Sequence, residues 1–130
     1  MSCDARIDRE LKIVLIDDNE QVLKVHGSMV VTMGHGITSF TSPLEAVDYL
    51  ASDKNGVDLI ITDYRMPQMS GLELLSKIHI AGRALPAIIL TGYPDEVSRE
   101  VADQYGASIV CKPIRMAALA AHINELSARA

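Results

Sequence analysis

The sequence has few cysteines, no long apolar run and no cluster of basic residues, and each shortage excludes a class of protein. Its two cysteines, Cys3 in a polar leader and Cys111 in an apolar run, do not make a disulfide framework, and we expect Cys111 to be a small buried hydrophobe. No apolar run approaches the roughly 18 residues that span a bilayer. The first residues lack the apolar core of a secretion signal, so we expect a cytoplasmic protein without a membrane partner.

The charged residues and histidines exclude two further classes. The net charge is −5 and the lysines and arginines are scattered, which argues against direct nucleic acid binding. The four histidines have neither the spacing of a paired helical zinc site nor cysteines nearby at ligand spacing. We therefore expect ordinary helix-face or loop positions for His26, His35, His79 and His122.

Length and composition predict one globular domain. The chain has 130 residues, of which 48% are apolar and 22% charged, and this balance is typical of a single packed core. Residues 1–10 carry alternating charges without periodicity, so we expect a flexible leader there. The folded domain is expected over residues 11–130.

Short apolar runs alternate with helical patterns along the whole domain. We predict strands at residues 11–16, 37–40, 57–63, 85–90 and 107–111. We predict helices at residues 20–33, 42–52, 70–82 and 93–105, and a last helix from residue 116. Strict alternation implies a parallel sheet with right-handed crossovers, so the expected fold is a single-domain, doubly wound α/β unit of five (βα) repeats.

Helical spacing and capping patterns add detail to these helices. Ser42 and Ser70 each precede a glutamate by three residues, which is the capping-box pattern. The first helix is expected to pack through Val22, Val25, Met29 and Met33, with Leu23 and Val30 beside them. The last helix is expected to pack through Met116, Leu119, Ala120, Ile123 and Leu126.

Polar side chains stand at the ends of four predicted strands. They are Asp17 and Asp18, Asp63, Thr91 and Lys112. Each has an ordinary structural interpretation on its own: a cap for an acid, a turn hydroxyl for the threonine, a surface position for the lysine. The carboxyl ends of parallel strands lie at one edge of a sheet, where ligands bind, so the set together favours a functional site.

The types of residue at this edge indicate phosphoryl chemistry. Three neighbouring carboxylates repel one another, and a cation is normally needed to hold them together. Mg²⁺ prefers hard oxygen ligands and takes only one or two carboxylates, which fits this set better than zinc or copper. No serine, cysteine or histidine is placed beside a base, so Asp63 is the obvious nucleophile and could form an aspartyl phosphate.

Four segments in order closely resemble the receiver domain of two-component response regulators, the CheY-like family. The segments are 16–20 (IDDNE), Asp63 with 66–71 (MPQMSG), 90–92 (LTG) and 111–113 (CKP). The resemblance covers residues 11–126. It implies a five-stranded sheet with the flavodoxin-like order 2-1-3-4-5.

The resemblance also assigns roles to residues. Asp63 is the implied phosphoacceptor, receiving a phosphoryl group from a phosphohistidine of a sensor kinase or phosphotransfer domain. Thr91 is the implied hydroxyl that moves toward the phosphoryl group, and Lys112 is the lysine that pairs with it. Pro113 would follow a cis peptide bond, and Pro67 would help to shape the loop after Asp63.

The implied metal site holds Mg²⁺. Asp18 and Asp63 would ligate the ion directly, Asp17 would act through water, and the backbone carbonyl of Arg65 would supply a further oxygen. Gly71, like Pro67, would shape the loop after Asp63.

One residue departs from the family pattern. Many receivers place a switching aromatic on the fifth strand, three residues before the lysine, whereas this chain has Ile109 there. The only phenylalanine, Phe40, lies on the second predicted strand and cannot replace it. Phosphorylation would bias the loops and helices around the fourth and fifth strands, and a homodimer could form through residues 93–105, the fifth strand and the last helix.

Two other functions stay open. A small magnesium-dependent phosphatase or phosphotransferase can also use an aspartyl nucleophile, although such enzymes usually carry a large insertion over the substrate, and the connections here are short. A docking module with a vestigial site would bind no Mg²⁺. We expect a signalling domain that catalyses only its own phosphotransfer and dephosphorylation.

Overall fold

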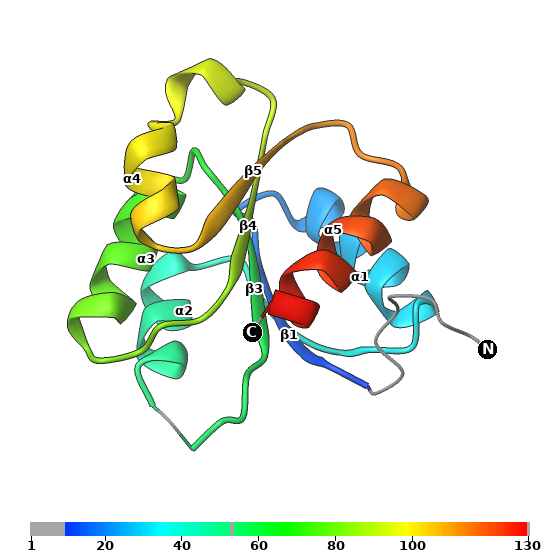
Figure 1. Ribbon diagram of the computed structural model, residues 1–130, viewed down its shortest axis with the longest axis horizontal. Helices are drawn as coiled ribbons and strands as arrows, with labels where there is room; N and C mark the ends of the chain where they lie inside the picture. Colours follow the sequence, from blue (N-terminus) through cyan, green and yellow to red (C-terminus); the bar gives the residue numbers. More distant parts are fainter. Residues whose placement is uncertain (1–9, 53, 130) are drawn as a thin grey trace.

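Five parallel strands form a single sheet at the centre of the molecule (Figure 1). The computed structural model describes residues 10–52 and 54–129, so residues 1–9 of the predicted leader lie outside the described residues. The sheet has the order β2-β1-β3-β4-β5, which confirms the predicted fold. Its strands are β1 (Lys12–Ile16), β2 (Gly36–Phe40), β3 (Leu59–Asp63), β4 (Ala87–Thr91) and β5 (Ala107–Cys111).

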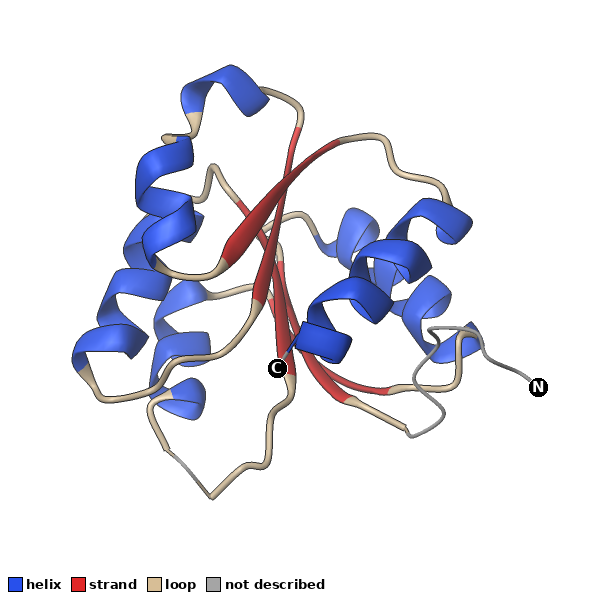
Figure 2. Cartoon of the chain, viewed as in Figure 1, coloured by secondary structure: helices blue, strands red, loops and turns tan. Residues whose placement is uncertain are grey.

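Helices cover both faces of the sheet (Figure 2). They are α1 (Glu20–Thr32), α2 (Pro43–Leu50), α3 (Gly71–Ile80), α4 (Arg99–Gln104) and α5 (Met116–Arg129), with a 3-10 helix η1 (Pro94–Glu96) before α4. Helices α1 and α5 lie on one face and α2, α3 and α4 on the other (Figure 1). Alternate side chains of the strands enter the two apolar cores, as in β1, where Val14 and Ile16 face one core and Ile13 and Leu15 the other.

The register of the strands aligns their carboxyl ends. Ile16 pairs with Thr62, Asp63 with Leu90, and Thr91 with Cys111. The residues that follow these strands therefore lie at one edge of the sheet, as the sequence predicts. None of the helices in the described ranges has both the length and the apolar character needed to cross a bilayer.

The predicted helix over residues 93–105 is interrupted, so that prediction was wrong in extent. η1 ends at Glu96, and Val97 adopts an extended conformation (φ −91°, ψ 125°) with its side chain only 5% exposed. Ser98 then caps α4 by accepting a hydrogen bond from the Val101 amide at 3.2 Å. Burial of Val97 in the core thus divides a segment whose spacing and acidic first turn indicate one helix.

α1 follows most of the predicted packing stripe, since Met29 and Met33 pack against the core as expected, but it departs from that stripe at Val25 and His26. Leu23, His26 and Val30 are buried, whereas Val25 is 55% exposed. A packing face that includes Val25 and one that includes His26 both have helical spacing, so spacing alone does not choose between them. The choice is made at Gly27, where a Cβ atom would lie 3.0 Å from the Ile37 side chain, because this close approach turns the Gly27 side of the helix toward the sheet.

Two other side chains are more exposed than the sequence indicates. Cys111, expected to be buried, is exposed at the end of the edge strand β5. Met116, expected in the core face of α5, is 43% exposed because it occupies the first turn of that helix. The core contacts of α5 are made by Leu119, Ile123 and Leu126, as predicted.

The predicted capping box is complete at the N-terminus of α3, whereas at α2 the described hydrogen bonds include only its serine half. Ser70 forms a complete capping box with Glu73: its hydroxyl accepts from the Glu73 amide at 3.1 Å, and its own amide donates to the Glu73 carboxylate at 2.9 Å. Ser42 caps α2 by accepting from the Glu45 amide at 3.3 Å. The first of these caps fixes the end of the loop that follows Asp63.

Candidate functional site

Three carboxylates meet at the carboxyl ends of β1 and β3. Oxygens of Asp17, Asp18 and Asp63 all lie within 4.8 Å of one another. Asp17 is buried, Asp63 is partly buried and Asp18 is exposed. The predicted acid cluster is therefore assembled with one open side, which a metal and a phosphoryl donor could approach.

Lys112 reaches the same cluster from the end of β5. Its ammonium nitrogen lies 3.2 Å from Asp17 Oδ2 and 3.2 Å from Asp63 Oδ1. The Lys112–Pro113 peptide bond is cis, as the family resemblance implies. One lysine thus pairs with two carboxylates, and the described ion pairs leave the cluster with more negative than positive charge.

The charge of Asp63 is unfavourable in this setting. Burial raises the pKa of the Asp63 carboxyl, and Asp17 raises it further, while Lys112 and the Tyr64 amide act in the opposite direction. The Tyr64 amide donates to Asp63 Oδ1 at 2.8 Å. Because the balance still lies above the ordinary aspartate value, a bound cation would favour the ionised, nucleophilic form.

Thr91 is held in place by two hydrogen bonds. It is 1% exposed, its hydroxyl oxygen accepts from the Tyr93 amide at 3.0 Å, and its carbonyl accepts from the Lys112 amide at 2.8 Å. Its neighbour Leu90 pairs with Asp63 across the sheet. The structure therefore places all four predicted strand ends, those of β1, β3, β4 and β5, around one site.

Asn19 has a part in the site that sequence reasoning missed. Its side chain caps α1 by accepting from the amides of Gln21 and Val22 at 3.0 and 3.1 Å. Its own amide donates to Asp17 Oδ1 at 2.9 Å. The N-cap preference of asparagine directly before the helical pattern was the available signal. Asn19 thus fixes the orientation of Asp17 relative to α1.

Gly71 lets α3 approach the backbone of Asp63. A Cβ atom on Gly71 would lie 2.6 Å from the Asp63 carbonyl oxygen. We expect Gly71→Ala to lower the free energy of unfolding by about 2 kcal/mol, because backbone must shift to relieve this overlap. Urea denaturation measures the change.

Gly92 provides the matched control for that substitution. It lies beside Thr91, and apart from Gly92 and its chain neighbours no heavy atom of the described residues lies within 4 Å of the Cβ position that alanine would fill. Gly92→Ala should change the free energy of unfolding by about 0.5 kcal/mol or less. Equal effects of the two substitutions would show that the contact at Gly71 does not restrict α3.

The donor set fits Mg²⁺. The ion prefers hard oxygen ligands and tolerates few protein carboxylates, keeping waters or a phosphate oxygen in its remaining positions. Asp17, Asp18 and Asp63 supply such oxygens with an exposed side. The Arg65 carbonyl remains a predicted ligand.

Comparison with known proteins agrees with this geometry. The response regulator receiver domain model matches residues 13–124. The chain belongs to the response regulator receiver domain family. Receiver domains act in two-component signal transduction, and phosphorylation on an aspartate is their general function.

The receiver domain is similar to parts of larger regulators and to isolated receiver structures. It is 32% identical to the transcriptional regulatory protein GlrR of Escherichia coli over 87% of this chain and 25% of that protein, so it spans about a quarter of that relative. A receiver domain protein from Clostridium thermocellum has 29% identity and a TM-score of 0.81, covering 92% of this chain and 95% of that one.

A third comparison concerns a structure with ligands. The response regulator TrrA from Thermotoga maritima, solved in complex with Mg²⁺-BeF, has 23% identity and a TM-score of 0.77. The alignment covers 89% of this receiver and 98% of that chain. At this identity the likeness shows a shared fold.

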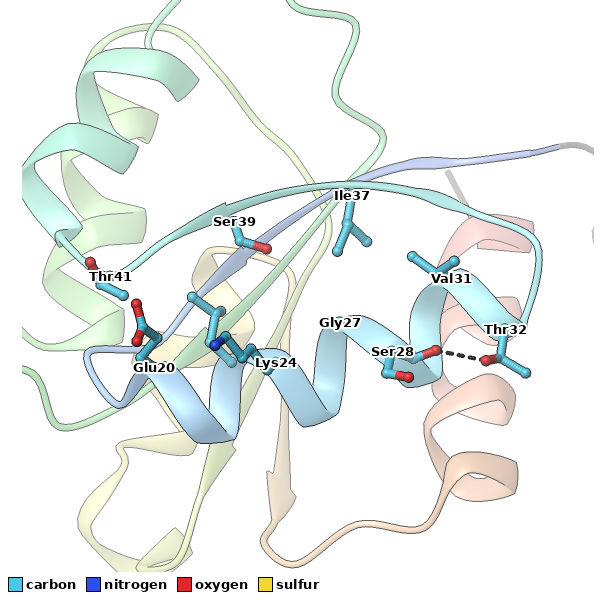
Figure 3. Close-up of a pocket in the computed structure, with 10 residues that line it drawn as sticks. Glu20, Lys24, Gly27, Ser28, Val31, Thr32, Ile37, Ser39 and Thr41 are labelled. Carbon is cyan, nitrogen blue, oxygen red and sulfur yellow. Dashed lines mark hydrogen bonds between the residues drawn. The ribbon is translucent and has the colours of Figure 1, made fainter.

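A groove on the α1–β2 surface of the receiver is distinct from the acid site (Figure 3). It has a volume of about 610 Å³ and runs from Glu20 and Lys24 past Gly27 to Thr32. Small side chains on α1 leave this space open, and the Thr32 hydroxyl is satisfied by the Ser28 carbonyl at 2.8 Å. The clustered carboxylates and Lys112 do not line it, so we place the chemistry at the strand ends.

Proposed function

We propose that Asp63 is the phosphoacceptor and takes a phosphoryl group from a kinase phosphohistidine with Mg²⁺ bound beside it. The observation that carries the proposal is the grouping of the Asp63 carboxylate with two further carboxylates, within 4.8 Å, and with Lys112 at 3.2 Å. Asp18, Asp63 and the Arg65 carbonyl would hold the ion directly, and Asp17 through water. When bound, Mg²⁺ would neutralise charge on the phosphoryl oxygens.

The residues of the chain have separate tasks in this transfer. An Asp63 carboxylate oxygen forms the new bond to phosphorus as the bond from phosphorus to the histidine nitrogen breaks, and that nitrogen keeps the electron pair. Lys112 pairs with the negative charge that arrives on the phosphoryl group, and the Thr91 hydroxyl turns to donate to one of its oxygens. Transfer of this kind depends on positioning and charge more than on acid or base chemistry.

An apolar groove beside Lys112 is our proposed docking place for the kinase or phosphotransfer domain. It has a volume of about 490 Å³ and is lined by Gln21, Val22, Val25, His26, Met29, Lys112, Pro113 and Ile114. Val25 is 55% exposed on it. Burial, and then the charge of Lys112, lower the pKa of His26, which disfavours the charged imidazolium on this wall. A helix with an apolar face would fit here and bring its phosphohistidine to Asp63.

Treatment with a small phosphodonor tests the proposed function. In acetyl phosphate and Mg²⁺, the wild type should gain the mass of one phosphoryl group, measured on the intact protein. Asp63→Asn should gain none, and Asp48→Asn, which changes an exposed acid on α2, should behave as the wild type. Equal phosphate uptake by the wild type and Asp63→Asn would contradict the assignment.

The alternative enzyme finds no support in the connections around the site. Only residues 17–19 separate β1 from α1, and residues 64–70 separate β3 from α3, so neither connection is long enough to form a cap over a substrate. We propose a signalling domain of the cytoplasm that turns over no separate substrate and binds no nucleic acid itself. Turnover of a phosphomonoester would contradict this.

Self-association through α4, β5 and α5 is a further proposal, which sedimentation with and without phosphodonor tests.

A further inference from the structure

Three side chains form a clamp over the loops that follow β3 and β4. The Arg65 guanidinium lies over the Tyr93 ring, 4.0 Å from the ring centroid. The same guanidinium forms a bidentate ion pair with Glu96, in which Nε lies 2.8 Å from Oε1 and a terminal nitrogen contacts Oε2. We call Arg65, Tyr93 and Glu96 the Arg65 clamp.

The Arg65 clamp connects the two loops that carry the proposed chemistry. Arg65 lies two residues after Asp63, and Tyr93 lies two residues after Thr91. Glu96 ends η1, and its carbonyl also accepts a hydrogen bond from the Tyr64 hydroxyl at 3.5 Å. The clamp therefore joins the loop of the phosphoacceptor to the segment that leads from Thr91 into α4.

Tyr93 links the clamp to the Thr91 hydroxyl. Its amide donates to Thr91 Oγ1 at 3.0 Å, while its ring stacks on Arg65. When the Thr91 hydroxyl turns toward a phosphoryl group on Asp63, its oxygen leaves the position in which it accepts from the Tyr93 amide. The backbone of Tyr93 then loses one of the contacts that hold the ring over Arg65.

We propose that the Arg65 clamp holds the segment from Gly92 to Val97 in the conformation of the unmodified protein, and that the movement of Thr91 on phosphorylation releases it. The clamp thereby takes the part of the aromatic that is absent at Ile109, and Arg65, Tyr93 and Glu96 are positioning residues for output through η1 and α4. This inference rests on the proposed phosphorylation of Asp63.

The strength of the clamp suits a reversible switch. The Arg65 and Glu96 side chains are 56% and 42% exposed, so their ion pair is screened by water. Such a pair together with a cation–π contact biases a two-state equilibrium by about fivefold. A bias of this size is overcome by phosphorylation and still keeps the unmodified protein mostly in one state.

Glu96→Gln and Asp95→Asn are matched tests. Both remove one negative charge from η1, but Asp95 is exposed and makes no ion pair among the described residues, whereas Glu96 is in the clamp. Amide chemical shifts of Val97 and Val101 are measured in each unmodified variant. The wild type, with and without acetyl phosphate and Mg²⁺, defines the two ends of the scale.

Glu96→Gln should move these shifts toward the phosphorylated end, because the ratio of the phosphorylated-like to the unmodified conformation rises by about fivefold. Asp95→Asn should leave them at the unmodified end, and Arg65→Gln combined with Glu96→Gln should add little to Glu96→Gln alone, because both break the same contact. If Glu96→Gln matches Asp95→Asn while the wild type takes up phosphate, the clamp proposal alone falls. If the wild type takes up no phosphate, the proposed function falls and the clamp proposal falls with it.

Discussion

Lys112→Met should lower the free energy of unfolding of the metal-free protein by about 2–3 kcal/mol at neutral pH. Lys112 lies 3.2 Å from both Asp17 and Asp63, and its removal leaves one buried and one partly buried carboxylate without their cation. The expected loss is smaller than that for a fully buried pair because the Lys112 side chain is 23% exposed. Methionine has a similar length, so lost packing contributes little.

The pH dependence of that loss follows from Asp63. Burial already raises the pKa of its carboxyl, and Lys112 is the group that most opposes this, so the pKa rises further without the lysine. A pKa above that of the unfolded chain means that the folded protein binds more protons, and stability falls as pH rises through that window. The defect of Lys112→Met should therefore be full at neutral pH and shrink as the pH is lowered toward the ordinary aspartate range.

Two control variants separate charge from position. Lys112→Arg keeps a cation at the site and should retain most of the stability. Lys24→Met removes an exposed lysine from α1 and should change stability by about 0.5 kcal/mol or less. Urea denaturation at several pH values measures all three. A Lys112→Met defect that is constant with pH would show that the lysine acts through packing and not through the acids.

Asp63→Asn should be more stable than the wild type without Mg²⁺ and less stable than the wild type with it. Without the metal the variant should be more stable at neutral pH, because it avoids ionising a group whose pKa is raised by burial and by Asp17. With Mg²⁺ at one hundred times its dissociation constant, the wild type should gain about 2.7 kcal/mol. The variant lacks one charged ligand, so its gain at the same concentration should be much smaller.

Thermal unfolding with and without Mg²⁺ measures this reversal. Asp48→Asn is the matched control, since it removes an exposed acid of α2 away from the cluster and should follow the wild type in both conditions. Equal stabilisation of wild type and Asp63→Asn by Mg²⁺ would place the ion elsewhere.

Much of the site could be predicted because parallel sheets align the carboxyl ends of their strands. Unbroken apolar runs mark the buried strands, and the polar residue after each run is then carried to a common edge. The pairing of Ile16 with Thr62 and of Thr91 with Cys111 realises this alignment. Asp17, Asp63 and Lys112 are brought within hydrogen-bonding or ion-pairing reach in this way.

What could not be predicted depends on packing between distant segments. The buried stripe of α1 is decided by the contact between Gly27 and Ile37, and the break before α4 is decided by the burial of Val97. In both segments the spacing of apolar residues is compatible with the predicted and with the observed arrangement, so spacing alone does not choose between them.

The Arg65 clamp was also beyond sequence reasoning. Tyr93 and Glu96 lie 28 and 31 residues after Arg65, all three side chains are exposed, and neither charge nor aromatic spacing indicates their contact. Only the fold, which places the β3 and β4 loops side by side, brings Arg65 to Tyr93 and Glu96. The absence of an aromatic at Ile109 was visible, whereas the contacts proposed to replace it were not.

The central claim is that the phosphoryl group resides on Asp63, and locating that group tests it most directly. The phosphorylated protein is reduced with borohydride, which converts an aspartyl phosphate into homoserine, and its peptides are sequenced by mass spectrometry. We expect the conversion at Asp63, dependent on Mg²⁺ and on the phosphodonor. Conversion at Asp17 or Asp18 instead, or none at all in a sample that has gained phosphate mass, would contradict the account.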